Sequence, residues 1–294
     1  MSTFTTRNTL SVTEPYRLDL TVEVLRRLAS NAVDVVSEDG AYYRALNVDG
    51  EPEIVRVVQR DPVTLEVAAS GARARHALAV VKRMLGVDAG VERWLEAAQR
   101  IPWLGRIAER FRGVRPPRYP TLWEACAHAI VFQQISIHAA SAIMRRLVET
   151  LGQPLRADGV TLRMFPSPDD LLRADDAALI EAGLSTNKRM HLRSVADAIR
   201  SGDLDERAIE SMTTPEAAQQ LVGVRGIGPW SASVVLLRGF GRMDAFPLRD
   251  SGVARTIVHL SGDPEISIDE VLDILGPERG MLYFHLLLGK LHDA

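Results

Sequence analysis

Apolar and polar residues alternate in short runs over much of the first hundred residues. Alternation with a period of two places the apolar side chains on one face of a strand. Three segments rich in Val, Leu, Ile or Tyr have this character: 41–48, 53–59 and 64–68. The Asp-Gly pairs Asp39-Gly40 and Asp49-Gly50 are favoured hairpin turns next to these segments. The pattern therefore predicts an antiparallel sheet.

A helical spacing of apolar residues accompanies these strands and then dominates. Segment 72–87 has apolar residues near every 3.6 positions, and short helices are also expected at 21–29 and 91–100. From Ile101 the spacing is helical, apart from the proline-rich connector 115–120 that no helix can cross. The helices expected in this part are 121–134, 137–151, 187–200, 215–222, 229–238 (ending at Gly239), 250–260, 267–275 and 277–291. We expect an α+β chain, with an N-terminal antiparallel-sheet domain at residues 1–100 and an all-α domain at residues 101–294.

The stretch 221–232 carries three glycines within six positions and separates two apolar helical patterns. Pro229 suits the first turn of a helix, so the pattern predicts a helix-hairpin-helix with its turn at 223–228. Gly226 and Gly228 allow positive φ and close backbone approach. Successive N–H groups at a helix N-terminus bind anions, and DNA phosphate is a suitable occupant. An ordinary tight turn between two core helices is the alternative.

A candidate carboxylate follows the hairpin. Asp250 lies 22 residues after Gly228, and the intervening helix and loop can bring it back beside the hairpin. It also stands at the start of a further predicted helix. Because Asp is a favoured N-cap residue, a purely structural cap is the alternative role.

The composition adds one local feature, an arginine cluster, to the predicted fold. The net charge is −3, but residues 100–118 contain six arginines and one acid, a cluster suited to phosphate. Cys126 is the single cysteine, which excludes an internal disulfide and a four-cysteine iron–sulfur cluster. The seven histidines show no metal-ligand spacing. No apolar run reaches the roughly 18–20 residues of a membrane span. The polar start 1–8 lacks an apolar signal region, so we expect a cytoplasmic location.

Three motifs occur together: Gln133-Gln134-Ile135-Ser136, the stretch 222–232 and Asp250. Together they resemble the helix-hairpin-helix (HhH-GPD) DNA glycosylases, and over about residues 15–292 the chain is most similar to the bacterial 3-methyladenine DNA glycosylase II type. The resemblance implies base excision repair, in which the enzyme extrudes an alkylated base from the duplex and hydrolyses its N-glycosidic bond. We expect double-stranded DNA containing damaged bases as the partner, no membrane and no obligate protein partner, with a monomer as the default.

The resemblance also implies roles for individual residues. Asp250 is the catalytic carboxylate, which stabilises an oxocarbenium-like sugar or directs water to it. Three hairpin glycines are implied phosphate contacts through their backbone: Gly223, Gly226 and Gly228. The region that matches the DNA wedge comprises Pro117, Arg118 and Tyr119, with Pro117 nearest to the intercalating position. Such side chains can fill the gap left by a flipped base, and a surface connector is the alternative.

The base pocket is expected around Trp230. This residue stands two positions after the last hairpin glycine, where bifunctional relatives have a Schiff-base lysine, so we expect a monofunctional enzyme without AP lyase activity. Trp230 is expected to stack on the flipped base, and core packing is the alternative. Val234, Ser251 and Leu287 stand where that type has aromatic residues. A less aromatic pocket leaves the substrate range open.

The resemblance also implies a structural cation and no catalytic cofactor. The backbone carbonyls of Val222, Val224 and Ile227 match a monovalent cation site, for Na⁺ or K⁺. No cofactor is expected for catalysis, and no iron–sulfur cluster.

Two alternatives to alkylated-base excision stay open. The same chemistry can act on another lesion, such as hypoxanthine or an oxidised or deaminated base. The chain can also be a non-catalytic DNA-binding module that uses the hairpin for phosphate contact alone, although Asp250 in its motif argues against that.

Overall fold

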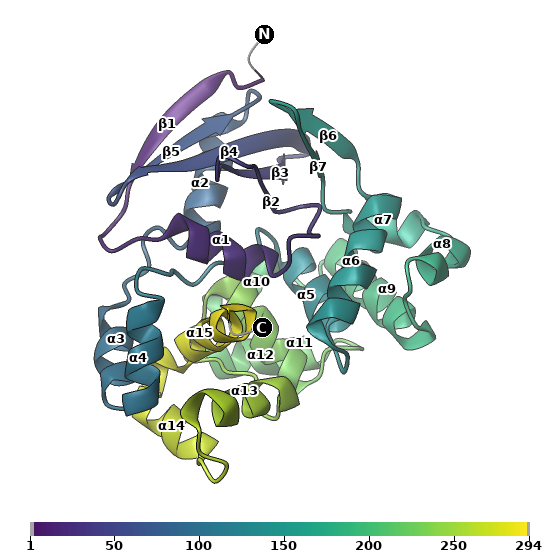
Figure 1. The fold of residues 1–294 in the computed structure, drawn as a ribbon. Coiled ribbons are helices and arrows are strands. Elements are labelled where there is room, and N and C mark those ends of the chain that lie inside the picture. Colours follow the sequence, from purple (N-terminus) through teal and green to yellow (C-terminus); the bar gives the residue numbers. More distant parts are fainter. Residues whose placement is uncertain (1–2, 293–294) are drawn as a thin grey trace.

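Five antiparallel strands form the N-terminal sheet in the computed structural model, which describes residues 3–292 (Figure 1). The strand order is β1-β5-β4-β3-β2. The strands are β1 (Thr6–Ser11), β2 (Val35–Val36), β3 (Tyr42–Val48), β4 (Glu51–Asp61) and β5 (Thr64–Ala69). Alternation along β3 separates its two faces: Tyr42 and Leu46 belong to the main apolar core, whereas Tyr43 and Ala45 belong to a second cluster.

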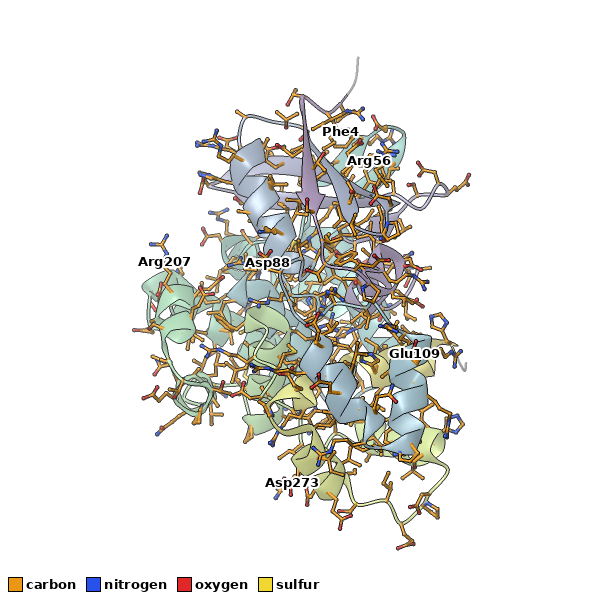
Figure 2. The ribbon with its side chains drawn as sticks, turned by 90° about the vertical axis from the view of Figure 1, so that its left-hand side faces the viewer. Phe4, Arg56, Asp88, Glu109, Arg207 and Asp273 are labelled. Carbon is orange, nitrogen blue, oxygen red and sulfur yellow. The ribbon has the colours of Figure 1, made fainter. Side chains whose placement is uncertain are left out.

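Both faces of the sheet are covered. Helix α2 (Ala74–Met84) packs against the sheet, and α1 (Leu18–Arg26) lies between the sheet and the helical body (Figure 1). A hairpin of β6 (Pro154–Ala157) and β7 (Val160–Arg163) contributes Leu162 to the second cluster, together with Phe4 and Tyr43. Figure 2 shows Phe4 at the sheet end of the molecule and Asp273 of the helical body at the opposite end.

The helical body is built around α5, whose residues are all buried and which packs against α9 and α12. Its helices are α3 (Glu92–Gln99), α4 (Pro102–Arg110), α5 (Leu122–Val131), α6 (Ile137–Leu151), α7 (Pro168–Arg173), α8 (Asp176–Glu181), α9 (Thr186–Ser201), α10 (Glu206–Ser211), α11 (Thr214–Val222), α12 (Pro229–Phe240), α13 (Ser251–Ser261), α14 (Ile268–Leu275) and α15 (Arg279–His292), with a 3₁₀ turn at Gly276–Glu278. Gly239 lets α12 approach α5 closely, because a Cβ at this position would lie 2.9 Å from the Cβ of Ala125.

A buried charge cluster joins the sheet to the helical body. Arg44 of β3 is fully buried and forms ion pairs with Asp34 and with Glu124 of α5, the latter at 2.5 Å. Tyr42 adds a hydrogen bond of 2.7 Å from its hydroxyl to Asp34. Burial raises the pKa of the Glu124 carboxyl to about 7, although Arg44 opposes this shift. Arg44, Asp34 and Glu124 therefore depend on one another for charge compensation, since all three side chains are buried.

The expected fold class is confirmed, with local differences. The β6–β7 hairpin was not expected, although Asp158-Gly159 forms its two-residue turn with φ of 49° and 82°. Helix α12 continues through Gly239 and ends at Phe240, and the C-cap residue Gly241 has the left-handed φ of 68° that favours glycine. The boundary near residue 100 stays a prediction, since one apolar core continues from α1 and the sheet into α15.

Candidate active site and nucleic-acid interface

The helix-hairpin-helix is present where the sequence predicts it, between α11 and α12. Gly226 has a φ of 99°, and a Cβ there would lie 2.4 Å from the Cβ of His191, so this position requires glycine. Gly228 differs from the expectation of positive φ, since its φ is −90°. A Cβ at Gly228 would meet nothing within 4 Å, so glycine there leaves bare backbone at the start of α12.

The hairpin is held by the loop that follows α5. Gln133 donates from Nε2 to the carbonyl of Gly226 at 2.9 Å and to the hydroxyl of Ser231 at 2.7 Å. Lys188 of α9 in turn donates from Nζ to the carbonyls of Gln133, at 3.1 Å, and of Val131, at 2.5 Å. Partial burial lowers the pKa of the Lys188 ammonium. The loop and the hairpin are thereby fixed relative to one another.

Asp250 is both the N-cap of α13 and the acceptor of a bond from the hairpin helix. Its Oδ1 accepts from the backbone N–H groups of Gly252, at 2.8 Å, and Val253, at 3.0 Å. Its Oδ2 accepts from the indole Nε1–H of Trp230 at 2.9 Å. The sequence left catalysis and capping as alternatives for Asp250, but the geometry is compatible with both, because the cap uses one carboxylate oxygen and the indole holds the other.

A cavity of about 1250 Å³ opens between the hairpin, α13, α15 and the loop after α5. Its walls include the predicted catalytic, base-pocket, phosphate and cation residues: Asp250; Trp230, Val234, Ser251 and Leu287; Gly223, Gly226 and Gly228; Val222, Val224 and Ile227. The fold therefore brings together residues that lie as much as 65 positions apart in the chain, from Val222 to Leu287. Their individual roles stay predictions.

The cavity wall also contains residues that were not predicted as site residues, among them the four described next. Arg27 comes from the end of α1, and its guanidinium carbon lies 3.9 Å from the centroid of the Phe132 ring. Tyr283 and Lys290 come from α15. Phe132 directly follows α5 and is partly buried. No motif marks Arg27, because its approach to the cavity depends on how α1 packs against the helical body.

The structure does not bring the predicted DNA wedge, Pro117, Arg118 and Tyr119, to the cavity. None of these residues lies on the cavity wall, and Pro117 and Tyr119 are buried. The Tyr119 ring stacks on His128 at 4.1 Å, and its backbone N–H donates to the carbonyl of Arg238 at 2.7 Å. The prolines make this segment a buried connector between the two parts of the chain.

An exposed loop lies on the cavity wall instead, directly after α5. Gln134 is an exposed non-glycine residue with a left-handed φ of 58°. Ile135 is a large apolar side chain that is 38% exposed. Non-glycine residues in this backbone region are uncommon and persist only where their surroundings hold them, here through Gln133 and the hairpin.

A group of stacked rings reaches the cavity wall at His128 and Phe132. His128 stacks between Tyr119 and Phe132, with ring centroids at 4.1 and 6.0 Å. Its Nδ1 donates to the carbonyl of Glu124 at 3.0 Å. Burial lowers the pKa of His128 far below its ordinary value, and Arg27 adds to this effect, so the ring is neutral.

Neither a metal cluster nor a membrane span is found within residues 3–292. No group of three or more His, Cys, Asp or Glu side chains in this range can hold a metal ion. No helix in the same range is long and apolar enough to cross a membrane. Cys126 is buried in α5, and burial raises the pKa of its thiol.

The sequence of this chain matches a known protein family. Residues 127–275 match the family described as HhH-GPD superfamily base excision DNA repair protein. The chain belongs to this family. The matched range starts within α5 and ends with α14, so it contains the loop after α5, the hairpin and Asp250. This HhH-GPD protein carries its N-terminal sheet outside the matched range.

Individual relatives extend the comparison. The chain is 29% identical to the DNA-3-methyladenine glycosylase of Bacillus subtilis over 192 residues, which cover 65% of this chain and 63% of that protein. It is 32% identical over 252 residues to a probable bifunctional transcriptional activator/DNA repair enzyme AlkA of Mycobacterium tuberculosis, covering 83% and 50%. The chain thus spans between half and two thirds of the length of these curated relatives. A 3-methyladenine DNA-glycosylase from Archaeoglobus fulgidus has the same fold, with a TM-score of 0.81, 24% identity and coverage of 96% and 97%.

Proposed function

We propose that this HhH-GPD protein is a DNA glycosylase that excises alkylated bases from duplex DNA by hydrolysing the N-glycosidic bond. One observation carries the proposal: the Asp250 carboxylate lies on the wall of a large cavity beside the hairpin and is held by Trp230 and the first amides of α13. The relatives named DNA-3-methyladenine glycosylase support the same reaction class.

The chemistry requires one negative group that is already in position. As the base leaves, positive charge develops on the sugar, and a preorganised carboxylate stabilises that charge or directs water to the sugar carbon. An alkylated purine that carries positive charge is a good leaving group, so a second acid is not required. Asp250 meets this need because its two oxygens are fixed by donors and do not have to reorganise during the reaction.

DNA contact is assigned to the hairpin and to the loop after α5. The N–H groups at the start of α12 offer a phosphate site, and the absence of a side chain at Gly228 allows the DNA backbone to approach. Across the cavity, Gln134 and Ile135 are the exposed residues suited to fill the gap left by the extruded base. This loop replaces the connector 117–119 as the proposed wedge.

The structural cation is proposed at the end of α11. The last carbonyls of a helix have no partner within the helix, and oxygen donors of this kind suit Na⁺ or K⁺. Val222 ends α11, and Val224 and Ile227 follow in the hairpin. The Val224 carbonyl already accepts the N–H of Ile227 at 3.1 Å and retains its second lone pair. When bound, the ion adds fixed positive charge beside the phosphate site.

A base-release assay on methylated duplex DNA tests the function. The protein is incubated with DNA treated with a methylating agent, and free bases are separated and identified. We expect release of methylated purines as free bases, with abasic sites left in the DNA. Tight binding to the same DNA without any base release would instead favour the non-catalytic DNA-binding module.

A further inference from the structure

Arg27 supplies a buried cation to the cavity from outside the matched family range. It follows directly after α1 and is 7% exposed. Its backbone has φ of 61° and ψ of −61°, and its N–H donates to the carbonyl of Glu23 at 2.8 Å. A non-glycine residue is strained in this backbone region, so its surroundings must hold it there.

The guanidinium lies where two cavities meet. One is the large cavity of the hairpin and Asp250, and the other is a small one between α1 and α6 that Leu25, Met144 and Val148 also line. Both cavities share Arg27, His128 and Phe132. The guanidinium covers the Phe132 ring at 3.9 Å, which orients its plane.

One of its donors has no partner. Nη1 of Arg27 is buried and forms no hydrogen bond within the described residues. Leaving a buried donor unpaired is costly, so such a group beside a ligand cavity indicates an acceptor on the ligand. The acidic side chains of this region do not accept a hydrogen bond from Nη1 of Arg27, because both Asp34 and Glu124 pair with Arg44.

The surrounding groups leave this end of the cavity positive. His128 is neutral and already donates from Nδ1 to a backbone carbonyl. Arg238, fully buried, contacts the Tyr119 ring at 4.7 Å and interacts with the Tyr283 hydroxyl. A base that enters from the Asp250 side therefore approaches Arg27, a residue of the cavity wall that carries positive charge and an unpaired donor.

Guanidinium chemistry distinguishes two kinds of base edge. It has donors and no acceptor, so it binds an exocyclic oxygen, as at O6 of guanine or hypoxanthine. It has nothing to offer the amino group of adenine, whose N–H groups are donors as well. Its charge also disfavours a base that is itself cationic, by Coulomb repulsion in a desolvated site.

We propose that Arg27 is a specificity-determining residue that donates a hydrogen bond to the exocyclic oxygen of the extruded base. This inference rests on the proposed glycosylase function and refines it. Among methylated purines, 7-methylguanine is then preferred to 3-methyladenine, because both are cationic and only the former has O6. Hypoxanthine, neutral and carrying O6, satisfies Arg27 without the repulsion.

The experiment measures the two methylated purines in one reaction. Methylated duplex DNA contains both, so their single-turnover release by the same enzyme sample gives a ratio in which differences in enzyme concentration cancel. We expect Arg27→Met to lower the ratio of 7-methylguanine to 3-methyladenine release by about 10-fold, as for loss of a charged hydrogen bond. Release of hypoxanthine from a defined duplex falls as well, whereas Arg27→Lys, which keeps a charged donor, retains a ratio closer to that of the wild type.

The matched control is Arg26→Met. Arg26 is the neighbouring arginine; it lines the small cavity but not the large one, and it donates to the carbonyl of Ala29 at 3.1 Å. We expect the wild-type ratio in this variant. Equal loss of both bases in Arg27→Met would overturn the proposal, because it would assign Arg27 a packing role, and an unchanged ratio would overturn it too.

A measurement on the wild type covers the case in which Arg27→Met does not fold, as judged by thermal unfolding. Spontaneous loss of each base is followed in parallel without enzyme, and the rate enhancement over that background is compared. The proposal requires a larger enhancement for 7-methylguanine than for 3-methyladenine, and an equal or smaller one contradicts it. If the wild type releases no base at all, the glycosylase function itself fails, which is distinct from failure of the Arg27 assignment alone.

Discussion

The indole Nε1 of Trp230 donates a hydrogen bond of 2.9 Å to Oδ2 of Asp250, and both residues line the cavity. From the sequence we expect Trp230 to stack on the extruded base. The hydrogen bond adds a second role, because it orients the Asp250 carboxylate. The two roles are compatible, since the bond uses the edge of the indole and stacking uses its face.

Trp230→Phe separates these roles, because it keeps an aromatic face and removes the N–H. Loss of a hydrogen bond to a charged group is worth about 1.5–3 kcal/mol, so we expect base release to slow by about 10–100-fold with little change in DNA binding. Single-turnover release and binding to abasic DNA measure both. Trp103→Phe is the control, because the buried Trp103 indole N–H has no acceptor in the described chain. An unchanged release rate in Trp230→Phe would show that the contact does not orient the carboxylate.

Asp250→Asn keeps the cap of α13 and removes the negative charge. Asn and Asp are comparable N-cap residues, so we expect the thermal stability to change little. Base release is expected to fall by at least about 100-fold, the size of effect seen when one preorganised transition-state contact is removed. Asp175→Asn, at the exposed N-cap of α8, is the matched control and should release bases normally. Near-normal release by Asp250→Asn would remove Asp250 from the reaction.

Lys290 provides a test of the expectation that the proposed glycosylase is monofunctional. It is the one lysine among the residues that line the cavity within the described part of the chain. The resemblance implies that Trp230 occupies the place of the Schiff-base lysine of bifunctional glycosylases. We expect no covalent protein–DNA adduct when the reaction is treated with borohydride. An adduct that disappears in Lys290→Ala would contradict this expectation and identify Lys290 as the nucleophile.

The buried charge cluster sets the stability of the junction between sheet and helices. Arg44→Met leaves the carboxylates of Asp34 and Glu124 without their partner, so we expect the free energy of unfolding to fall by about 3–5 kcal/mol. Urea unfolding measures this change. Arg60→Met removes an exposed ion pair with Glu66 and is expected to cost less than about 1 kcal/mol. Equal losses in the two variants would contradict the assignment.

His285 makes stability depend on pH in the acidic range. Burial lowers its pKa from 6.5 to about 4, with Nδ1 donating to Met281 and Nε2 accepting from Trp94. Between these two values the unfolded state binds a proton that the folded state does not, so stability falls as the pH drops from about 6.5 towards 4. The loss due to His285 is about 3 kcal/mol. His285→Gln should be less stable at pH 8 but show a flatter decline, and parallel curves would refute the attribution.

Several parts of the site could be predicted because they are local in the chain. Gly226 must be glycine for steric reasons that a hairpin motif already implies, and Asp250 stands at a helix start that its own residue type favours. Val234, Ser251 and Leu287 were expected at the base pocket from the resemblance to the family, and all three line the cavity.

The failures have a different physical origin. The resemblance to the family placed the wedge at Pro117, Arg118 and Tyr119, yet stacking on His128 and the contact with Arg238 bury Tyr119. Arg27 was missed because its approach to the cavity depends on how the end of α1 packs against Phe132 of the helical body. Long-range packing of this kind leaves no periodicity in the sequence.

The apolar core that runs from α1 and the sheet into α15 has a consequence for exchange of the N-terminal part. If residues 1–100 were exchanged for those of a relative, the new α1 would pack against an α15 whose side chains fit the original α1. The exchange would alter one wall of the cavity at the position of Arg27 while leaving the hairpin and Asp250 intact. The N-terminal part therefore contributes one wall residue, Arg27, to a cavity whose hairpin and Asp250 come from the other part of the chain.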